Sequence, residues 1–315
     1  MEKRSRPEEG LLMCDKCQIK AYRPRVGPTR AFQVHSDVLF KIGRFRRSGL
    51  LYTLQKDQTE AVRTAEWFMV DAFKREGEKP IRNVALRQFA DQEKEALKNL
   101  KRIQSKKYIQ KDALDMVFQI FDIEFWYKET VKRFGPSIAA TALQGFKVGL
   151  SRVDAVLDFD PEADRIRQTL TEVLSKTKGI NDSVLDDLVK NIQRGLDEGA
   201  EDFVPYVQRA FNVSRSRAQT IGQTAATPGF EVGQIQAFED AGFPFKGWIS
   251  RRDGLVRTGK FDHLEPDESG QRVKISEPFT VSGESLMFPG DPVGSAGNVI
   301  NCRCTTEPFE KLIDE

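Results

Sequence analysis

Four stretches in the last quarter of the chain decide its fold: GWISRRDGLVR at 247–257, FDHLEPDESGQRV at 261–273, EPFTVSGESLMFPGDP at 277–292 and NVINCRC at 298–304. Short strand-like pieces alternate here with Gly, Pro and Asp turns, and the helical period disappears after Phe243. Apolar residues before this point recur at helical spacing. The sequence therefore predicts an α+β fold, with a predominantly helical body and a small turn-rich α+β domain at the C-terminal end.

The composition is typical of a soluble protein with many exposed helix faces. The chain has 315 residues, enough for two or three domains, and it is 39% hydrophobic and 30% charged. No apolar run approaches membrane-spanning length, and the charged N-terminus lacks the apolar segment of a secretory signal. Without export, we expect the four cysteines to be reduced thiols or metal ligands rather than disulfides.

Glycine, proline and capping residues divide the helical part of the chain. We expect helices to end or break at Gly77 with Pro80, at Gly135 with Pro136 and at Pro228. Helix starts are expected at four places, which are residue 57, Asp112, Asp160 with Pro161 at the first position, and Asn181 or Asp182. Ser214 is expected to open the helix that Pro228 interrupts.

An aromatic stripe lies after Asp112, in FQIFDIEFWY at 118–127. Its simplest interpretation is a helix face in the core. Because it has more rings than one core stripe needs, an oligomer contact is the alternative.

The N-terminal region is strongly basic. Between Lys16 and Lys56 it has ten Lys or Arg residues and one acid, Asp37, with poor periodicity. One interpretation is a solvated basic arm. The other is a segment that contacts phosphates, because clustered cations gain by releasing counterions from nucleic acid. An acidic protein partner would attract the same arm. The residues expected to contact DNA are Lys16, Lys20, Arg23, Arg25, Arg30, Lys41, Arg44, Arg46 and Arg47.

These patterns predict three parts. They are a basic, mostly irregular N-terminal arm at 1–56, a helical domain at 57–210 and the small C-terminal domain at 211–315.

The cysteines form two close pairs at opposite ends of the chain, Cys14 with Cys17 and Cys302 with Cys304. The thiolates of NCRC and the imidazole of His263 could be three ligands of a tetrahedral zinc site. A Cys-x-x-Cys pair is a good half-site, so a zinc ion held by all four thiolates is the predicted metal site. Four thiols without metal are the alternative.

Further polar residues surround His263. An Asp and an Arg four residues apart, Asp253 and Arg257, predict a structural ion pair. The acids Asp262, Glu265 and Asp267 make a hydrolytic metal site conceivable, although they are also typical of a polar surface loop.

Packing and turn chemistry explain the remaining motifs of the C-terminal quarter. Pro289 and Gly290 predict a type II turn followed by extended chain at Asp291. Trp248 is expected to anchor the core of the small domain together with Phe279 and Phe288.

In this order, the motifs resemble the C-terminal domain of phage minor head proteins, the Mu F-like and SPP1-type head morphogenesis family. The shared elements are a Trp, a spaced Asp and Arg, a His before a polar turn, a Phe before a Gly, a PGDP-like turn and a closing NCRC. The resemblance covers about residues 211–308. Its elements in this chain are Trp248, Asp253, Arg257, His263, Pro289, Gly290, Asp291 and the NCRC cysteines.

The resemblance implies a non-enzymatic minor head protein that associates with the portal vertex and acts in head assembly and DNA packaging or ejection. Its implied partners are the portal protein, capsid or scaffold proteins and phage DNA, with several copies per head. Its implied location is the virion, in the head interior or at the portal vertex, after assembly in the host cytoplasm.

Two departures from the family pattern limit what is carried over. The family often has Arg-Thr-Glu in the helix before the Trp strand, where this chain has Gly222-Gln223-Thr224-Ala225, so no role of that Glu applies here. His263 also follows Arg257 at a longer spacing than the family's Arg-x-x-His, so a partnership of these two residues is not carried over.

Two other function classes remain open. One is a metal-dependent hydrolase or toxin-related enzyme using His263 and nearby acids, since related C-terminal domains occur fused to toxin or peptidase modules. The other is a plain DNA-binding protein working through the arm. No P-loop, dinucleotide fingerprint or nucleophile elbow is present, so no catalytic residue is predicted. Neighbouring portal, terminase and scaffold genes would distinguish the head protein from the others.

Overall fold

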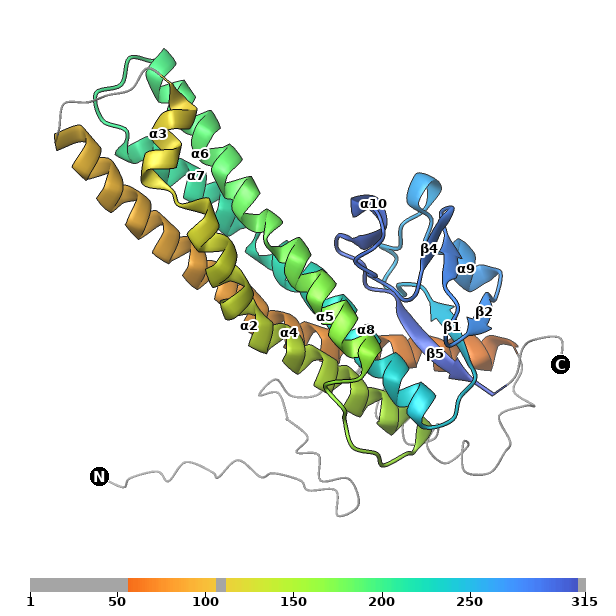
Figure 1. Cartoon of the computed structure of the whole chain (residues 1–315). Helices are drawn as coiled ribbons and strands as arrows, with labels where there is room; N and C mark the ends of the chain where they lie inside the picture. Colours follow the sequence, from red (N-terminus) through yellow and green to blue (C-terminus); the bar gives the residue numbers. More distant parts are fainter. Residues whose placement is uncertain (1–55, 106–111, 311–315) are drawn as a thin grey trace, which may run out of the picture. The chain divides into compact units, whose positions relative to one another are not determined.

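The computed structural model of the chain describes residues 56–105 and 112–310 (Figure 1), with side chains described from residue 60. The chain divides into two compact units, Met1–Ala65 and Glu66–Glu315, and the fold below is that of the second. The basic arm, with Cys14, Cys17 and the nine residues expected to contact DNA, lies outside the described residues. These expectations therefore stay predictions.

Within the described residues, the part up to Asp240 is mainly helical, and short strands and turns follow it. The long helices are α2 (Lys56–Ser105), α3 (Ala113–Ile120), α4 (Ile123–Val153), α5 (Asp164–Thr177), α6 (Gly179–Asp197), α7 (Val204–Ser216) and α8 (Ala218–Asp240). None of the described helices is both long and apolar enough to cross a membrane. The expected fold class, a helical body with a small α+β end, is confirmed.

The helix breaks expected at prolines are wrong. Pro80 lies inside α2, Pro136 inside α4 and Pro228 inside α8. Each proline removes one backbone hydrogen bond of its helix. Packing of the adjacent turns outweighs this loss, because neighbouring side chains lie in the core: Ile81, Ile138 and Phe230 are at most 1% exposed.

Only part of the expected capping is correct. Asp112 caps α3, since its carboxylate accepts from the backbone N–H groups of Leu114 and Asp115. Asp160 instead forms a turn before α5, which begins four residues later, and Ser214 lies inside α7.

Asn181 and Asp182, expected as caps, lie inside α6. Asn181 is fully buried, where a polar amide needs partners. Its Oδ1 accepts from Gln88 and Gln92 of α2, and its Nδ2 donates to Thr130 of α4. Asn181 therefore joins three helices instead of starting one.

The aromatic stripe is core only in part. Phe121 and Trp126 are buried, but Phe118 and Phe125 are 53% and 44% exposed. The reason is a break at Phe121 and Asp122, where α3 ends and α4 begins with Asp122 as its N-cap. A single helical phase therefore does not continue through the stripe.

Helices α4 and α8 pack at backbone distance through glycines. Two similar stretches, GFKVG at 145–149 and GFEVG at 229–233, face each other. A Cβ on Gly145 would lie 1.9 Å from the carbonyl oxygen of Phe230, and a Cβ on Gly233 would lie 1.9 Å from that of Ala142. Larger residues at these positions would push the two helices apart.

A three-stranded antiparallel sheet with the order β2-β1-β5 organises the C-terminal part (Figure 1). Its strands are β1 (Phe245–Ile249), β2 (Arg272–Lys274) and β5 (Thr305–Phe309), and Trp248 of β1 lies opposite Thr306 of β5. A separate hairpin joins β3 (Phe279–Val281) to β4 (Glu284–Leu286). The C-terminal part also contains three short helical turns, η2 (Gly259–Phe261), α9 (Glu265–Glu268) and α10 (Ala296–Val299).

Trp248 anchors this part of the core as expected. Its ring packs edge to face against that of Phe279, with 5.4 Å between the ring centroids. The same buried cluster contains Val281, Leu286, Cys302 and Cys304. The expectation that Phe288 shares this core is wrong, because Phe288 packs in the cluster that contains Phe238 of α8.

The PGDP turn has the expected form. The N–H of Asp291 donates to the carbonyl of Phe288, and Gly290 has φ +78° as position three of a type II turn requires.

Candidate metal centre

Three chemically reactive side chains meet in the core of the C-terminal part. His263 lies between η2 and α9, and its backbone N–H donates to the carbonyl of Arg257. Cys302 and Cys304 lie between α10 and β5. Asn301 precedes them with φ +58°, which reverses the chain so that both cysteines return toward the sheet.

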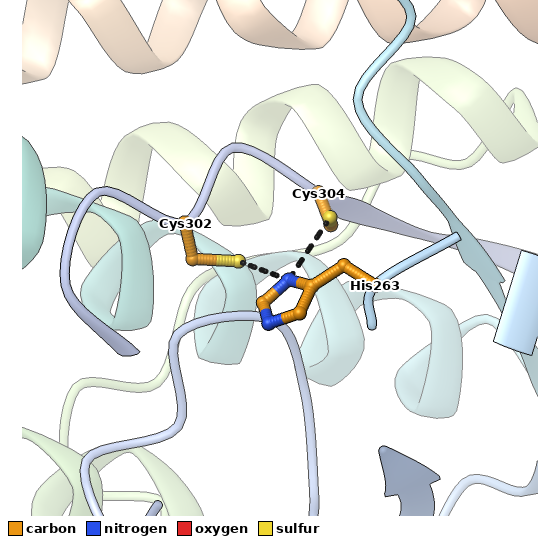
Figure 2. A group of neighbouring side chains, drawn as sticks. All are labelled: His263, Cys302 and Cys304. Carbon is orange, nitrogen blue, oxygen red and sulfur yellow. Dashed lines mark hydrogen bonds between the residues drawn. The ribbon is translucent and has the colours of Figure 1, made fainter. Parts of the chain in front are cut away.

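The two sulfurs converge on one ring nitrogen. Figure 2 shows both cysteine sulfurs facing the Nδ1 atom of the His263 imidazole, which is 3.6 Å from Sγ of Cys302 and 3.5 Å from Sγ of Cys304. All three residues are buried, and their possible ligand atoms lie within 4.8 Å of one another. The group can therefore hold a metal ion.

Asn298 fixes the tautomer of His263. Its Nδ2 donates to the carbonyl of Val281 at 3.5 Å, so its Oδ1 is turned toward Nε2 of His263, 3.2 Å away. Nε2 then carries the proton, and the lone pair of Nδ1 points to the sulfurs. Metal-binding histidines are usually oriented in this way by a partner on the second nitrogen.

The two thiols are electrostatically different. A hydrogen bond with Cys304 lowers the pKa of Cys302 well below its ordinary value, with further lowering by His263 and Lys74. Burial raises the pKa of Cys304 well above its ordinary value, and the neighbouring Cys302 raises it further. The two thiols are therefore unequal before any metal binds, and a bound cation would favour the thiolate form of both.

Helices α2 and α8 bind the Cys302–Cys304 segment and the start of β5 through buried polar contacts. Nζ of Lys74 donates to the carbonyl of Cys304 at 2.6 Å and forms an ion pair with Glu231 of α8 at 2.5 Å. The same carboxylate accepts from Thr305 and Thr306 of β5. Because Lys74 and Glu231 are almost fully buried, each depends on these partners.

Arg303, between the two cysteines, points away from them into this helical layer. Its guanidinium pairs with Asp71 and Glu78 of α2, and Trp67 donates to its carbonyl at 2.8 Å. In the segment just before β5, the side chains thus alternate, with both sulfurs toward His263 and Arg303 toward the helices. The Cys-x-Cys spacing therefore brings both thiols to one imidazole nitrogen.

The ion pair expected between Asp253 and Arg257 is wrong. Asp253 pairs with Arg251, two residues before it, which lowers the pKa of Asp253. Arg257 donates to the carbonyl of Gly297 in α10. The intervening turn contains Gly254 with φ +73°, so the helical spacing assumed for the pair does not apply.

The acids near His263 do not point into the group. Asp262 accepts from the backbone N–H groups of Leu264 and Glu265, and Asp267 holds Ser250 and Arg252. They organise the loop around the imidazole. Within the described residues, the group that could hold a metal ion consists of His263, Cys302 and Cys304.

Sequence reasoning identified all three of these residues but missed their support. Asn298 stood in the quoted NVINCRC motif, yet an amide gives no signal of its own until its partner His263 is placed. Lys74 and Glu231 looked like ordinary charges of helix surfaces. Helical spacing was the available signal that they face inward, because Val70 lies four residues before Lys74, Ile235 lies four residues after Glu231, and both are buried.

Comparisons with known proteins returned no match: no family model fits the sequence, and no curated protein or solved structure is significantly similar to it.

Proposed function

We propose that the chain is a non-enzymatic minor head protein of a tailed phage, associated with the portal vertex and acting in head assembly and DNA packaging or ejection. One observation carries the proposal: elements of the resemblance that are distant in sequence form one buried unit. Trp248 donates from Nε1 to the carbonyl of His263 at 3.1 Å and shares its core with Cys302 and Cys304. Such convergence is what a shared domain core requires, whereas chance motifs would scatter.

The use of the nearby acids supports a non-enzymatic role. A metal-dependent hydrolase usually needs a general base close to the metal-bound reactant. Asp262 and Asp267 are occupied by backbone and side-chain donors of their own loop. The hydrolase remains the second candidate, and it requires turnover that depends on His263.

Association with a portal ring tests the head-protein proposal. The chain would be co-expressed with the portal protein encoded nearest to it and sedimented with the assembled rings. We expect the chain to move with the rings, and a portal from an unrelated phage serves as control. Sedimentation of the chain only at the position of free protein, with both portals, would count against the proposal.

We propose that the group of His263, Cys302 and Cys304 binds zinc. Bonds of about 2.3 Å to sulfur and about 2.05 Å to nitrogen, at a tetrahedral angle, separate the two ligand atoms by about 3.6 Å. The observed distances from Nδ1 of His263 to the two sulfurs are 3.5 Å and 3.6 Å. Two thiolates and one imidazole are also a ligand set that zinc prefers.

His263 occupies one of the four positions of a tetrahedral site. A zinc ion bound by His263, Cys302 and Cys304 therefore has room for at most one thiolate of the Cys14 and Cys17 pair. The four-thiolate arrangement predicted from the sequence is accordingly replaced, in this proposal, by a site built on His263. The zinc would join the loop before α9 to the start of β5 and thus stabilise the fold.

Metal analysis of the purified full chain tests the zinc site. We expect about one zinc per chain, lost in both Cys302→Ser and His263→Ala and retained in the double variant Cys14→Ser, Cys17→Ser. Asn298→Ala should retain zinc with about 10-fold to 100-fold weaker affinity, the usual effect of removing a ligand's hydrogen-bonding partner. A wild-type chain that is metal-free after refolding with zinc would reject the site.

A further inference from the structure

The candidate metal centre adjoins a hollow of about 110 Å³. Cys302, Cys304 and His263 form one part of its wall. The remainder consists of Arg251, Leu255, Val256, Arg257, Asn301 and Arg303. The three residues that could bind a metal ion therefore line the hollow.

The described part of the chain supplies three His, Cys, Asp or Glu donors to the group. A tetrahedral zinc site with three protein ligands keeps its fourth position for water or another exchangeable ligand. The adjoining hollow provides the space from which such a ligand can approach.

Three arginines, Arg251, Arg257 and Arg303, form the charged part of the wall, and no acidic side chain among the described residues lines it. Arg303 is neutralised by Asp71 and Glu78, and Arg251 pairs with Asp253. Arg257 is different, because its hydrogen bond goes to the carbonyl of Gly297, which does not cancel its charge. A divalent metal with two thiolates is itself neutral, so the hollow keeps a positive potential beside the fourth position.

We propose that the fourth position takes a small carboxylate from this hollow, with Arg257 as its second partner. The inference rests on the proposed zinc site. A carboxylate suits both contacts, since one oxygen can bind zinc while the other accepts a charge-assisted hydrogen bond from a guanidinium. A hollow of about 110 Å³ accommodates a ligand of a few heavy atoms, since one water takes up about 30 Å³ in the liquid.

Cobalt substitution makes the fourth ligand visible. The full chain is loaded with one equivalent of Co²⁺, and its visible spectrum is followed while acetate is added at constant ionic strength. We expect saturable changes in the d–d bands with the thiolate charge-transfer band retained. Acetamide, which has the same shape without charge, should produce no change below a tenfold higher concentration.

Arg257→Gln should weaken acetate binding about tenfold, the effect of losing one charge-assisted hydrogen bond. Arg257→Lys keeps the charge and should weaken it less, which separates loss of charge from local disturbance. Arg209→Gln, at an exposed position on α7 outside the hollow, is the matched control and should leave acetate binding unchanged.

The outcomes separate the two proposals. Absence of a thiolate charge-transfer band with Co²⁺ overturns the zinc site and this inference together. A cobalt spectrum that acetate leaves unchanged overturns the inference alone, as does an equal response to acetamide. A spectrum altered by Cys14→Ser with Cys17→Ser also overturns it, because the fourth ligand would then come from the chain.

Discussion

Lys246 is a charged residue held in the interior of the C-terminal part. Nζ donates to the carbonyls of Ile275 and Met287 at 2.9 Å and 2.7 Å. Burial and, to a smaller extent, the charge of Arg165 together lower its pKa to about 7, against the opposing effect of Asp291. The ammonium group therefore titrates in the folded chain near neutral pH.

This shift predicts a pH dependence of stability. The pKa of Lys246 is about 7 when folded and about 10.4 when unfolded, so the unfolded chain binds more protons between these values. The free energy of unfolding should therefore rise with pH across this window, by up to about 1.4 kcal/mol per unit, while the full cost of burial is present below it.

Urea unfolding from pH 6 to pH 10 measures the effect. The difference in stability between wild type and Lys246→Met should change along this slope, whereas the exposed control Lys260→Met should run parallel to wild type. Parallel curves for all three proteins would show that Lys246 does not titrate in this range.

For single residues, the sequence predicted which side chains belong to the candidate metal centre better than it predicted which side chains pair with each other. His263, Cys302 and Cys304 were identified because two thiolates and an imidazole are a ligand set typical of zinc. Asp253 was assigned the wrong arginine, since a turn with Gly254 at positive φ changed which side chains meet. Spacing alone cannot reveal such a change.

The two glycine stretches set the distance between α4 and α8. Gly145→Ala should lower the free energy of unfolding by about 3 kcal/mol, at the upper end for overpacking, because the obstacle is the backbone oxygen of Phe230 at 1.9 Å. Gly179→Ala is the matched control: its Cβ would meet its nearest neighbour at 3.8 Å, so stability should stay equal or rise by up to about 1 kcal/mol.

Denaturant unfolding of both variants decides the point. Equal stability of Gly145→Ala and wild type would mean that α4 and α8 are not in backbone contact there.

Elements were predicted well in type and poorly in extent. Local rules for proline gave breaks at Pro80, Pro136 and Pro228, but packing along the flanking turns overrides a local rule. The sequence did contain a missed signal. The matching stretches GFKVG and GFEVG place small residues four apart on two helices, a pattern typical of close helix contact.

For the molecule as a whole, the charge imbalance of the arm predicts DNA binding without sequence preference. A full chain with its nine expected DNA contacts changed to Gln should lose most of its affinity at low salt. The wild type should show a log–log salt slope that grows by about −0.9 for each phosphate neutralised. The control carries Gln at three exposed cations of the helical part, Lys132, Arg167 and Lys176.

Fluorescence anisotropy with a duplex and with an unrelated second duplex measures both affinity and sequence preference. Equal retention by the wild type and the nine-site variant would remove the arm as the DNA-binding segment. It would leave an acidic protein partner or plain solvation as its role.

The sequence predicted the fold class because helical and strand periods separate cleanly near Phe243. It could not predict how the two parts are joined. Lys74 meets Cys304 and Arg303 meets Asp71 across more than two hundred residues, through charges that are fully satisfied only when both parts are in place. The predicted domain division at 211 remains a prediction.

Helix α8 links the helical body to the sheet, and this link determines how the molecule unfolds locally. The same turns of α8 pack through Gly233 against α4 and bind β5 through Glu231 and Gln234. Arg152 of α4 also donates to the carbonyl of Thr306 in β5 at 2.6 Å, so the three elements hold one another. Native-state hydrogen exchange should therefore give the amides of α4 around Phe146 and those of β1 around Trp248 one common opening free energy, as members of a single cooperative unit.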